Sequence, residues 1–129
     1  MIVGFTGSRH DRPQATLERL RTILVEWGVT EAHHGDCLGF DAQAHDVCES
    51  LGISTVAHPP TDPRMRAWKK ADVILPARPY LDRNKDIVRA VQKLIAAPDG
   101  PERLRSGTWS TVRFAKEIGV RGIVLAWPT

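Results

Sequence analysis

The sequence has few of the patterns that mark secreted, zinc-binding or membrane proteins. Its 129 residues include two cysteines, Cys37 and Cys48, which form no CxxC pattern, so neither a disulfide framework nor a zinc site is expected. No apolar run approaches the roughly 20 residues of a membrane span. The first residues also lack the charged and apolar regions of a secretion signal. We therefore expect a cytoplasmic protein that makes no membrane contact.

Neither sign of charge is in large excess. The chain has 18 Lys and Arg residues and 15 Asp and Glu residues, a net charge of +3, and no run of like charges forms a basic tail. This balance suits a small anionic ligand at least as well as nucleic acid, whose binders gather Lys and Arg on one face. The length and the ordinary apolar fraction of 42% indicate one globular domain over residues 1–129.

Short apolar runs alternate with helical patterns, which is typical of an α/β fold. Helices are expected at 13–27, 40–51, 80–92 and 109–118, and strands at 2–6, 31–34, 53–57, 73–75, 94–97 and 122–127. We predict a Rossmann-like three-layer sandwich with a mostly parallel sheet. In such a sheet the ligand site lies outside the carboxyl ends of the strands, where the strand order reverses.

Four polar segments, three of which contain glycine, fall at this predicted edge, and the first follows the first strand directly. Gly7 lets backbone amides approach an anion, Ser8 adds a hydroxyl donor, and Arg9 can bind a phosphate through two nitrogens. A tight turn with a surface arginine is the structural alternative. The segment is neither GxGxxG nor a Walker lysine loop, which disfavours an ordinary dinucleotide dehydrogenase.

The second segment enters the second helix. Gly35 and Gly39 flank a loop whose following helix terminus favours an anion. Asp36 is predicted to bind a ribose hydroxyl, whereas Asp41 fits helix capping and ligand binding equally well. Asp41 also lies one turn before His45, a spacing compatible with a metal or an acid–base pair. Because no third ligand has diagnostic spacing, no metal and no cofactor is predicted.

The third and fourth segments open later helices. Arg83 and Asn84 lie in a first helical turn, where the dipole disfavours a cation, so the arginine indicates an anion to neutralise. A solvated surface arginine is the alternative. Ser106, Gly107 and Thr108 follow a strand and offer amides and hydroxyls, with one of the two hydroxyls expected to cap the helix. Trp109 fits base stacking and core packing equally well.

Together these segments resemble the SLOG superfamily, which is named for the Smf/DprA and LOG groups of Rossmann-like proteins. Thr6-Gly7-Ser8-Arg9 resembles its opening motif, and residues 35–45 resemble the DprA-type loop G-x-A-x-G-I-D-x-x-A-H. Arg83-Asn84 matches the family's arginine–asparagine pair, and residues 106–108 match its second glycine loop. The resemblance implies a small protein that senses or processes a nucleotide-derived ligand and that self-associates as a homodimer or larger homo-oligomer.

The resemblance is less specific for activity. LOG-type phosphoribohydrolases carry PGGxGTxxE, but here Ser106 replaces the second glycine and Thr111 the glutamate, so no catalytic residue is assigned. DprA proteins are longer. The leading hypothesis is a nucleotide or nucleotide-derived phosphate ligand held by the four segments. The alternatives are an N-glycosidase or phosphoribohydrolase that uses Asp41 or Asp36, and a DprA-like module for single-stranded DNA.

Overall fold

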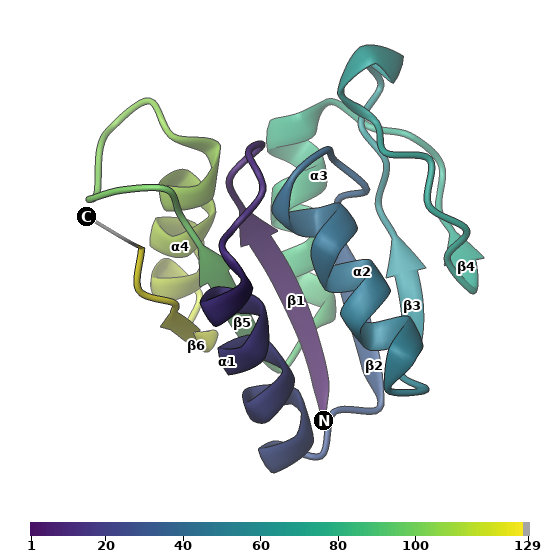
Figure 1. The fold of residues 1–129 in the computed structure, drawn as a ribbon. Helices are drawn as coiled ribbons and strands as arrows, with labels where there is room; N and C mark the ends of the chain where they lie inside the picture. The colour runs from purple at the N-terminus through teal and green to yellow at the C-terminus, as the bar shows by residue number, and fades with distance from the viewer. Residues whose placement is uncertain (128–129) are drawn as a thin grey trace.

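A computed structural model describes residues 1–127, and in this range it forms one six-stranded, fully parallel sheet (Figure 1). The strand order is β4-β3-β2-β1-β5-β6. In chain order the strands are β1 (Ile2–Gly7), β2 (Glu31–His34), β3 (Ser54–Ala57), β4 (Val73–Ile74), β5 (Lys93–Ala97) and β6 (Arg121–Val124). The sheet confirms the predicted α/β class.

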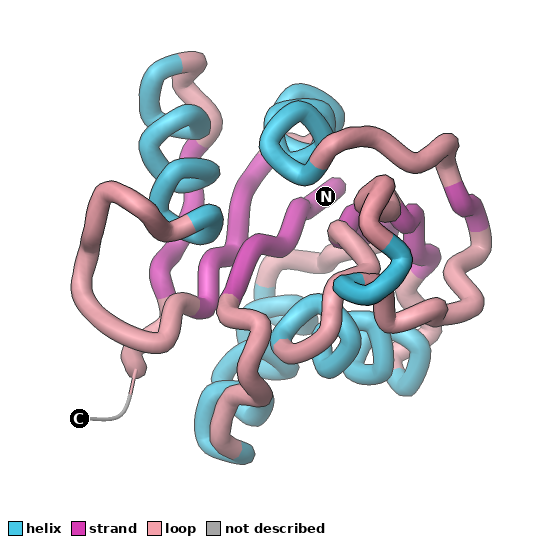
Figure 2. The backbone as a smooth tube through the Cα atoms, turned by 90° about the horizontal axis from the view of Figure 1, so that it is seen from above, coloured by secondary structure: helices cyan, strands magenta, loops and turns pink. Residues whose placement is uncertain are grey.

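Helices cover both faces of the sheet, and Figure 2 shows the strands lying between them. Helices α1 (Gln14–Glu26) and α2 (Phe40–Ser50) pack on one face, and α3 (Tyr80–Ala90) and α4 (Gly107–Glu117) pack on the other. A 3-10 turn, η1 (Pro63–Met65), lies in the proline-rich stretch. The predicted Rossmann-like three-layer arrangement is therefore confirmed.

Strand β5 shows how the sequence builds both cores. Ile95 and Ala97 belong to the cluster formed with α1 and α2, whereas Leu94 and Ala96 belong to the cluster with α3 and α4. Successive side chains of a strand point to opposite faces, so a central strand under two helix layers must be apolar throughout. This explains the continuous apolar run at 94–97.

Several predicted boundaries differ from the structure. Helix α4 begins at Gly107 because the Ser106 hydroxyl accepts a hydrogen bond from the Trp109 amide at 3.3 Å and so caps the helix. The last strand ends at Val124 rather than 127, and α3 ends at Ala90 rather than 92. Turn η1 was not predicted. The Asp62 carboxylate accepts from the Arg64 amide and caps it.

The topology brings two distant loops together at the carboxyl edge. The chain passes from β1 outward through β2, β3 and β4, and then returns to β5 on the other side of β1. Gly7 at the end of β1 is in register with Ala97 at the end of β5, and the Ser8 amide donates to the Ala97 carbonyl at 3.0 Å. The loops after β1 and β5 therefore border the crevice where such folds bind ligands.

A close contact between two glycine-bearing loops shapes this edge. Gly39 has φ +89°, and a Cβ atom there would collide with the backbone of Ser8 and Arg9. The next amide, that of Phe40, donates to the Ser8 carbonyl at 3.0 Å, and a side chain at Gly7 would in turn collide with the Phe40 ring. Glycine is required at both positions because the two loops pack directly against each other.

Substitution of Gly39 by alanine is expected to destabilise the protein more than the same change at Gly28. Both glycines have positive φ, but an added Cβ at Gly28 meets nothing within 4 Å. Backbone strain alone should cost Gly28→Ala about 1–2 kcal/mol, and forced packing should add about 1–3 kcal/mol at Gly39. Urea unfolding of both variants measures the difference. Equal losses would contradict the packing role of Gly39.

Candidate functional site

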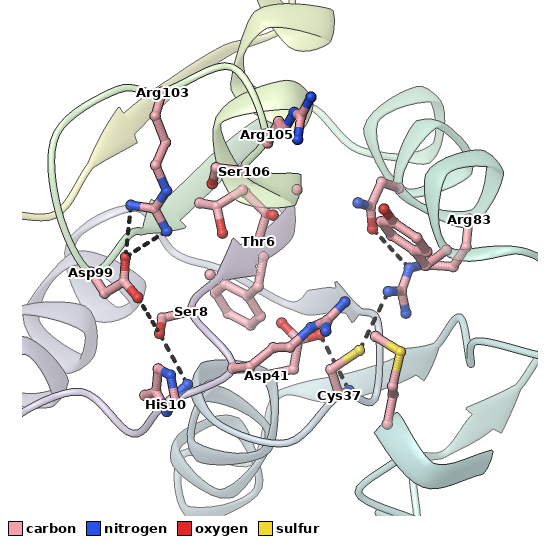
Figure 3. Close-up of a pocket in the computed structure, with 18 residues that line it drawn as sticks. Thr6, Ser8, His10, Cys37, Asp41, Arg83, Asp99, Arg103, Arg105 and Ser106 are labelled. Atoms are coloured by element: carbon pink, nitrogen blue, oxygen red, sulfur yellow. Dashed lines mark hydrogen bonds and ion pairs between the residues drawn. The ribbon is translucent and has the colours of Figure 1, made fainter. Parts of the chain in front are cut away.

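A cavity of about 430 Å³ opens at the carboxyl edge of the sheet (Figure 3). Three parts of the chain line it: the loop after β1, the loop after β5 with the start of α4, and the first turn of α3. Asp41 and Cys37, from the loop after β2 and the start of α2, complete the wall. The cavity therefore lies at the reversal of strand order and draws on segments far apart in the sequence.

The lining is rich in arginine. Arg9, Arg83, Arg103 and Arg105 line the cavity together with only two carboxylates, Asp41 and Asp99. Arg9 and Arg105 are exposed, and neither forms an ion pair within residues 1–127. Their guanidinium groups can bind a carboxylate or phosphate without first breaking an ion pair within the protein. The excess of positive charge favours an anionic ligand.

Polar groups of the two central loops converge on the same space. Gly107 and Thr108 form the first turn of α4, whose amides have no acceptor within the helix. Across the cavity, the Ser8 hydroxyl contacts the Asp99 carboxylate at 3.4 Å and accepts from the His10 amide at 3.0 Å. Arg103 donates two hydrogen bonds of 3.2 Å to Asp99. A helix terminus with nearby hydroxyls and arginines is a typical anion site.

Arg83 is buried and binds the protein itself. Its guanidinium donates to the carbonyls of Gly35 and His58, to the latter at 2.9 Å. It also donates to the Asn84 amide oxygen at 2.8 Å and approaches the Cys37 sulfur at 3.4 Å. Arg83 and Asn84 both line the cavity, but most of the arginine's donors are already used. Its first role is to join the loops after β2 and β3 to α3.

Asp41 has one occupied and one unoccupied carboxylate oxygen. Its Oδ2 accepts from the amides of Gly35 at 3.1 Å and Cys37 at 3.3 Å. Its Oδ1 is buried without a hydrogen-bond partner in the described chain. Burial raises the pKa of Asp41 to about 6, against the opposing effects of the Arg83 charge and the two amides. Asp41 therefore holds its loop through Oδ2, and it lines the cavity while its Oδ1 has no donor in the described chain.

Asp36 does not line the cavity, in contrast to the ribose contact predicted for it. It is fully buried, adopts φ +51°, and forms an ion pair of 2.8 Å with Arg66. It also accepts from the Lys69 amide at 3.0 Å. A buried carboxylate needs partners, and the loop at 61–70 supplies both. Asp36 therefore fastens that loop to the loop after β2.

The structure brings together nine of the twelve residues predicted for the site: Gly7, Ser8, Arg9, Asp41, Arg83, Asn84, Ser106, Gly107 and Thr108. Gly35 and Gly39 lie outside the lining with Asp36. A side chain at Gly35 would collide with Arg83 and Asp41, so this glycine also serves packing. Trp109 is buried, donates to the Gly100 carbonyl and stacks edge-on against Trp127, which places it in the core.

Sequence reasoning did not assign several lining residues: Thr6, Cys37, Tyr80, Asp99, Arg103 and Arg105. Asp99 had a usable signal, because it follows β5 as Arg9 follows β1 and parallel strands end at the same edge. The arginines precede the predicted Ser106 turn in the same loop. Tyr80 had none, since an aromatic residue at a helix start is as easily a core residue.

Two buried histidine pairs support the loops beneath the cavity. The Asp36 amide donates to His34 Nδ1 at 2.9 Å, so the remaining ring proton lies on Nε2 and is donated to His45 Nδ1 at 3.1 Å. His45 Nε2 then donates to the Glu49 carboxylate at 3.1 Å. A second ring proton on His34, at Nδ1, would have no acceptor and would point at the Asp36 amide, which is itself a donor. His45 is thus bound to His34 and Glu49, rather than paired with Asp41.

The hydrogen bonds of the second pair, His33 and His58, indicate where their ring protons lie in the same way. His33 bonds to the Glu31 carboxylate through Nε2 and to His58 Nε2 through Nδ1, both at 2.8 Å. Donation to the carboxylate leaves His33 Nδ1 as the acceptor for the His58 proton. Within residues 1–127, no group of three or more His, Cys, Asp or Glu residues could hold a metal ion.

Comparisons with known proteins identify the fold. No family model and no curated protein matches the chain. The molybdenum cofactor binding protein of Rippkaea orientalis matches with a TM-score of 0.75 and 19% identity, over 95% of this chain and 74% of that one. The Moco carrier protein of Chlamydomonas reinhardtii matches with a TM-score of 0.69 and 18% identity, over 98% and 76%.

DNA processing protein A of Helicobacter pylori, a single-stranded DNA binding protein, matches with a TM-score of 0.68 and 19% identity. The match covers 99% of this chain and 66% of that one. The chain therefore shares its Rossmann-like fold with these proteins. None of the helices in the described range has the length and hydropathy needed to cross a bilayer.

The paired histidines predict that the protein loses stability in mild acid. Burial, with the neighbouring histidines, lowers the pKa of His34 to about 3 and that of His58 to about 4, from 6.5. Below pH 6.5 these histidines therefore bind protons in the unfolded chain but remain neutral in the folded one. The free energy of unfolding falls as the pH is lowered to about 3. The raised pKa of Asp41 acts oppositely between about 4 and 6 and offsets part of this loss.

Urea unfolding between pH 7 and 4 measures the dependence. His58→Gln should flatten the slope by up to about one proton, whereas His10→Gln, at an exposed position, should leave it unchanged. If both variants show the same pH dependence of the free energy of unfolding as the native chain, the buried pair of His33 and His58 does not control acid stability.

Proposed function

We propose that this protein binds a nucleotide or nucleotide-derived phosphate ligand in the cavity between the loops after β1 and β5, as a sensor or processing protein. One observation carries the proposal. Ser8 and Arg9 line a single cavity together with Arg105 and Thr108, although almost one hundred positions separate the two loops. The cavity volume of about 430 Å³ falls within the range of about 300–1,000 Å³ of small-molecule sites.

The phosphate is proposed to lie at the start of α4. There it would accept hydrogen bonds from the free amides of the first turn, and the helix dipole would favour its negative charge. The hydroxyl of Thr108 adds a neutral donor. The exposed guanidinium groups of Arg9 and Arg105 supply the charge that neutralises the phosphate.

The remaining part of a nucleotide needs an apolar surface and hydrogen-bonding partners. Tyr80 lines the cavity with a partly exposed ring, and the Arg9 guanidinium lies 5.9 Å from its centroid. Met65 lines the same cavity. An aromatic ring beside a phosphate-binding arginine suits stacking of a base. A single cavity of about 430 Å³ suits a small ligand more directly than an extended strand of nucleic acid.

Arg9→Ala and Arg105→Ala should each weaken nucleotide binding about tenfold, because each removes a charge-assisted hydrogen bond of about 1.5 kcal/mol or more. Isothermal titration with AMP, ADP-ribose, NAD and cyclic nucleotides measures the effect. Arg19→Ala is the matched control, since Arg19 is exposed on α1 and outside the cavity. Arg83 is unsuitable for this test because it holds the fold together.

Two outcomes would contradict the proposal. The first is the absence of binding for every nucleotide up to millimolar concentration. The second is tight binding of a single-stranded oligonucleotide that falls steeply with salt while mononucleotides do not compete, because this pattern is typical of multiple phosphate contacts.

Cleavage of the ligand is a second candidate function, and Asp41 is the observation that favours it. Of the two carboxylates considered from the sequence, Asp36 is bound to Arg66, whereas Asp41 lines the cavity and its burial raises its pKa to about 6. An acid with a pKa near neutrality suits general acid–base catalysis. Thr111, at the LOG glutamate position, donates to the Gly107 carbonyl within α4 and supplies no carboxylate.

If the protein is a hydrolase, chromatography should show release of free base from a nucleoside monophosphate. Asp41→Asn should reduce this release at least a hundredfold, consistent with loss of an acid–base group. Asp82→Asn should not reduce it, because Asp82 is exposed and outside the cavity. Binding without any base release would exclude this second candidate and leave the binding proposal intact.

A further inference from the structure

We propose that Asp41 selects the ligand by accepting a hydrogen bond from a ribose hydroxyl through its free Oδ1, so that the preferred ligands are phosphate esters with an unmodified ribose. This inference rests on the proposed function and deepens it. It concerns the part of the ligand between phosphate and base. The arginines of the cavity do not indicate what this part is.

The unpartnered oxygen is the observation behind this inference. Asp41 exposes 7% of its surface, and a buried polar atom without a hydrogen bond is unfavourable. Capping of the loop explains Oδ2, which accepts hydrogen bonds from two amides. It does not explain why the second oxygen of this cavity-lining residue is buried without a donor. A ligand donor at this position would satisfy the oxygen.

The position of Asp41 matches the middle of a nucleotide. Figure 3 shows Asp41 between Ser8 of the proposed phosphate site and Cys37, with Arg83 further along the cavity. Tyr80, the proposed base contact, belongs to the same first turn of α3 as Arg83. Ribose connects phosphate and base, so its hydroxyls would fall between these contacts. A carboxylate is an acceptor when ionised and therefore recognises groups that donate.

The surroundings of Asp41 leave no protein donor for this oxygen. Arg83, whose charge acts on Asp41, donates its hydrogen bonds to the carbonyls of Gly35 and His58, to Asn84 and to Cys37. The amides of Gly35 and Cys37 already bind Oδ2. A side chain at Gly35 would collide with both Arg83 and Asp41, so the loop holds the carboxylate in place. The acceptor is thus preorganised for a group that the protein does not supply.

The test is the ratio of the dissociation constants of 2′,3′-dideoxy-AMP and AMP, measured by titration. This ratio cancels the shared phosphate and base contributions. For the native chain we expect a ratio of about 10 or more, the effect of losing a hydrogen bond to a charged acceptor. Asp41→Asn keeps one oxygen for the two loop amides and places an NH2 group where Oδ1 lay, so the ratio should fall to about 1–3.

Arg105→Ala is the matched control. It should weaken binding of both ligands and leave the ratio unchanged, because it alters the phosphate contact alone. A native ratio near 1, or a ratio that Asp41→Asn leaves unchanged, would overturn the inference while the proposed function stands. Failure of both ligands to bind would overturn the two together. The native ratio requires no variant, so a value near 1 overturns the inference even if Asp41→Asn folds poorly.

Discussion

The buried guanidinium of Arg83 joins the segments that form the site. It contacts the loop after β2 through Gly35 and Cys37, the segment after β3 through His58, and its own helix through Asn84. A buried cation is costly unless its donors are satisfied and an opposite charge is near. Protein carbonyls meet the first requirement, and the nearby Asp41 carboxylate meets part of the second. The geometry of the cavity wall depends on this arrangement.

The same constraint explains features that resemble ligand-binding motifs when seen in isolation. Gly35 leaves room for the Arg83 guanidinium, and Gly39 leaves room for the backbone of Ser8 and Arg9. Asp36 fixes the neighbouring loop through Arg66. These residues build a rigid support, and the residues that keep polar groups without a partner, Arg105 and Asp41 among them, line the cavity. A preorganised site loses less conformational freedom when a ligand binds.

The fold by itself does not choose the ligand. Structures with this architecture include molybdenum cofactor proteins and a single-stranded DNA binding protein, and one fold commonly carries several functions. What distinguishes this chain is the chemistry at the carboxyl edge. Exposed arginines gather around one helix terminus, a threonine occupies the glutamate position of LOG hydrolases, and one buried carboxylate oxygen lacks a donor. The proposed function follows from these residues rather than from the fold.

The sequence alone determined the α/β class, the loops at the carboxyl edge and half of the cavity-lining residues, because hydrophobic period and strand–loop–helix order are local properties. It also singled out Gly7, Gly35 and Gly39, although for anion binding rather than for the close packing found in the structure. Only the tertiary structure decided which polar groups are free. Asp36 and Arg83 look like ligand contacts along the chain, but Arg66 and two distant carbonyls bind them. Those partners lie 25 to 48 positions away, and no local pattern reveals a hydrogen bond between segments that meet only after the sheet has formed.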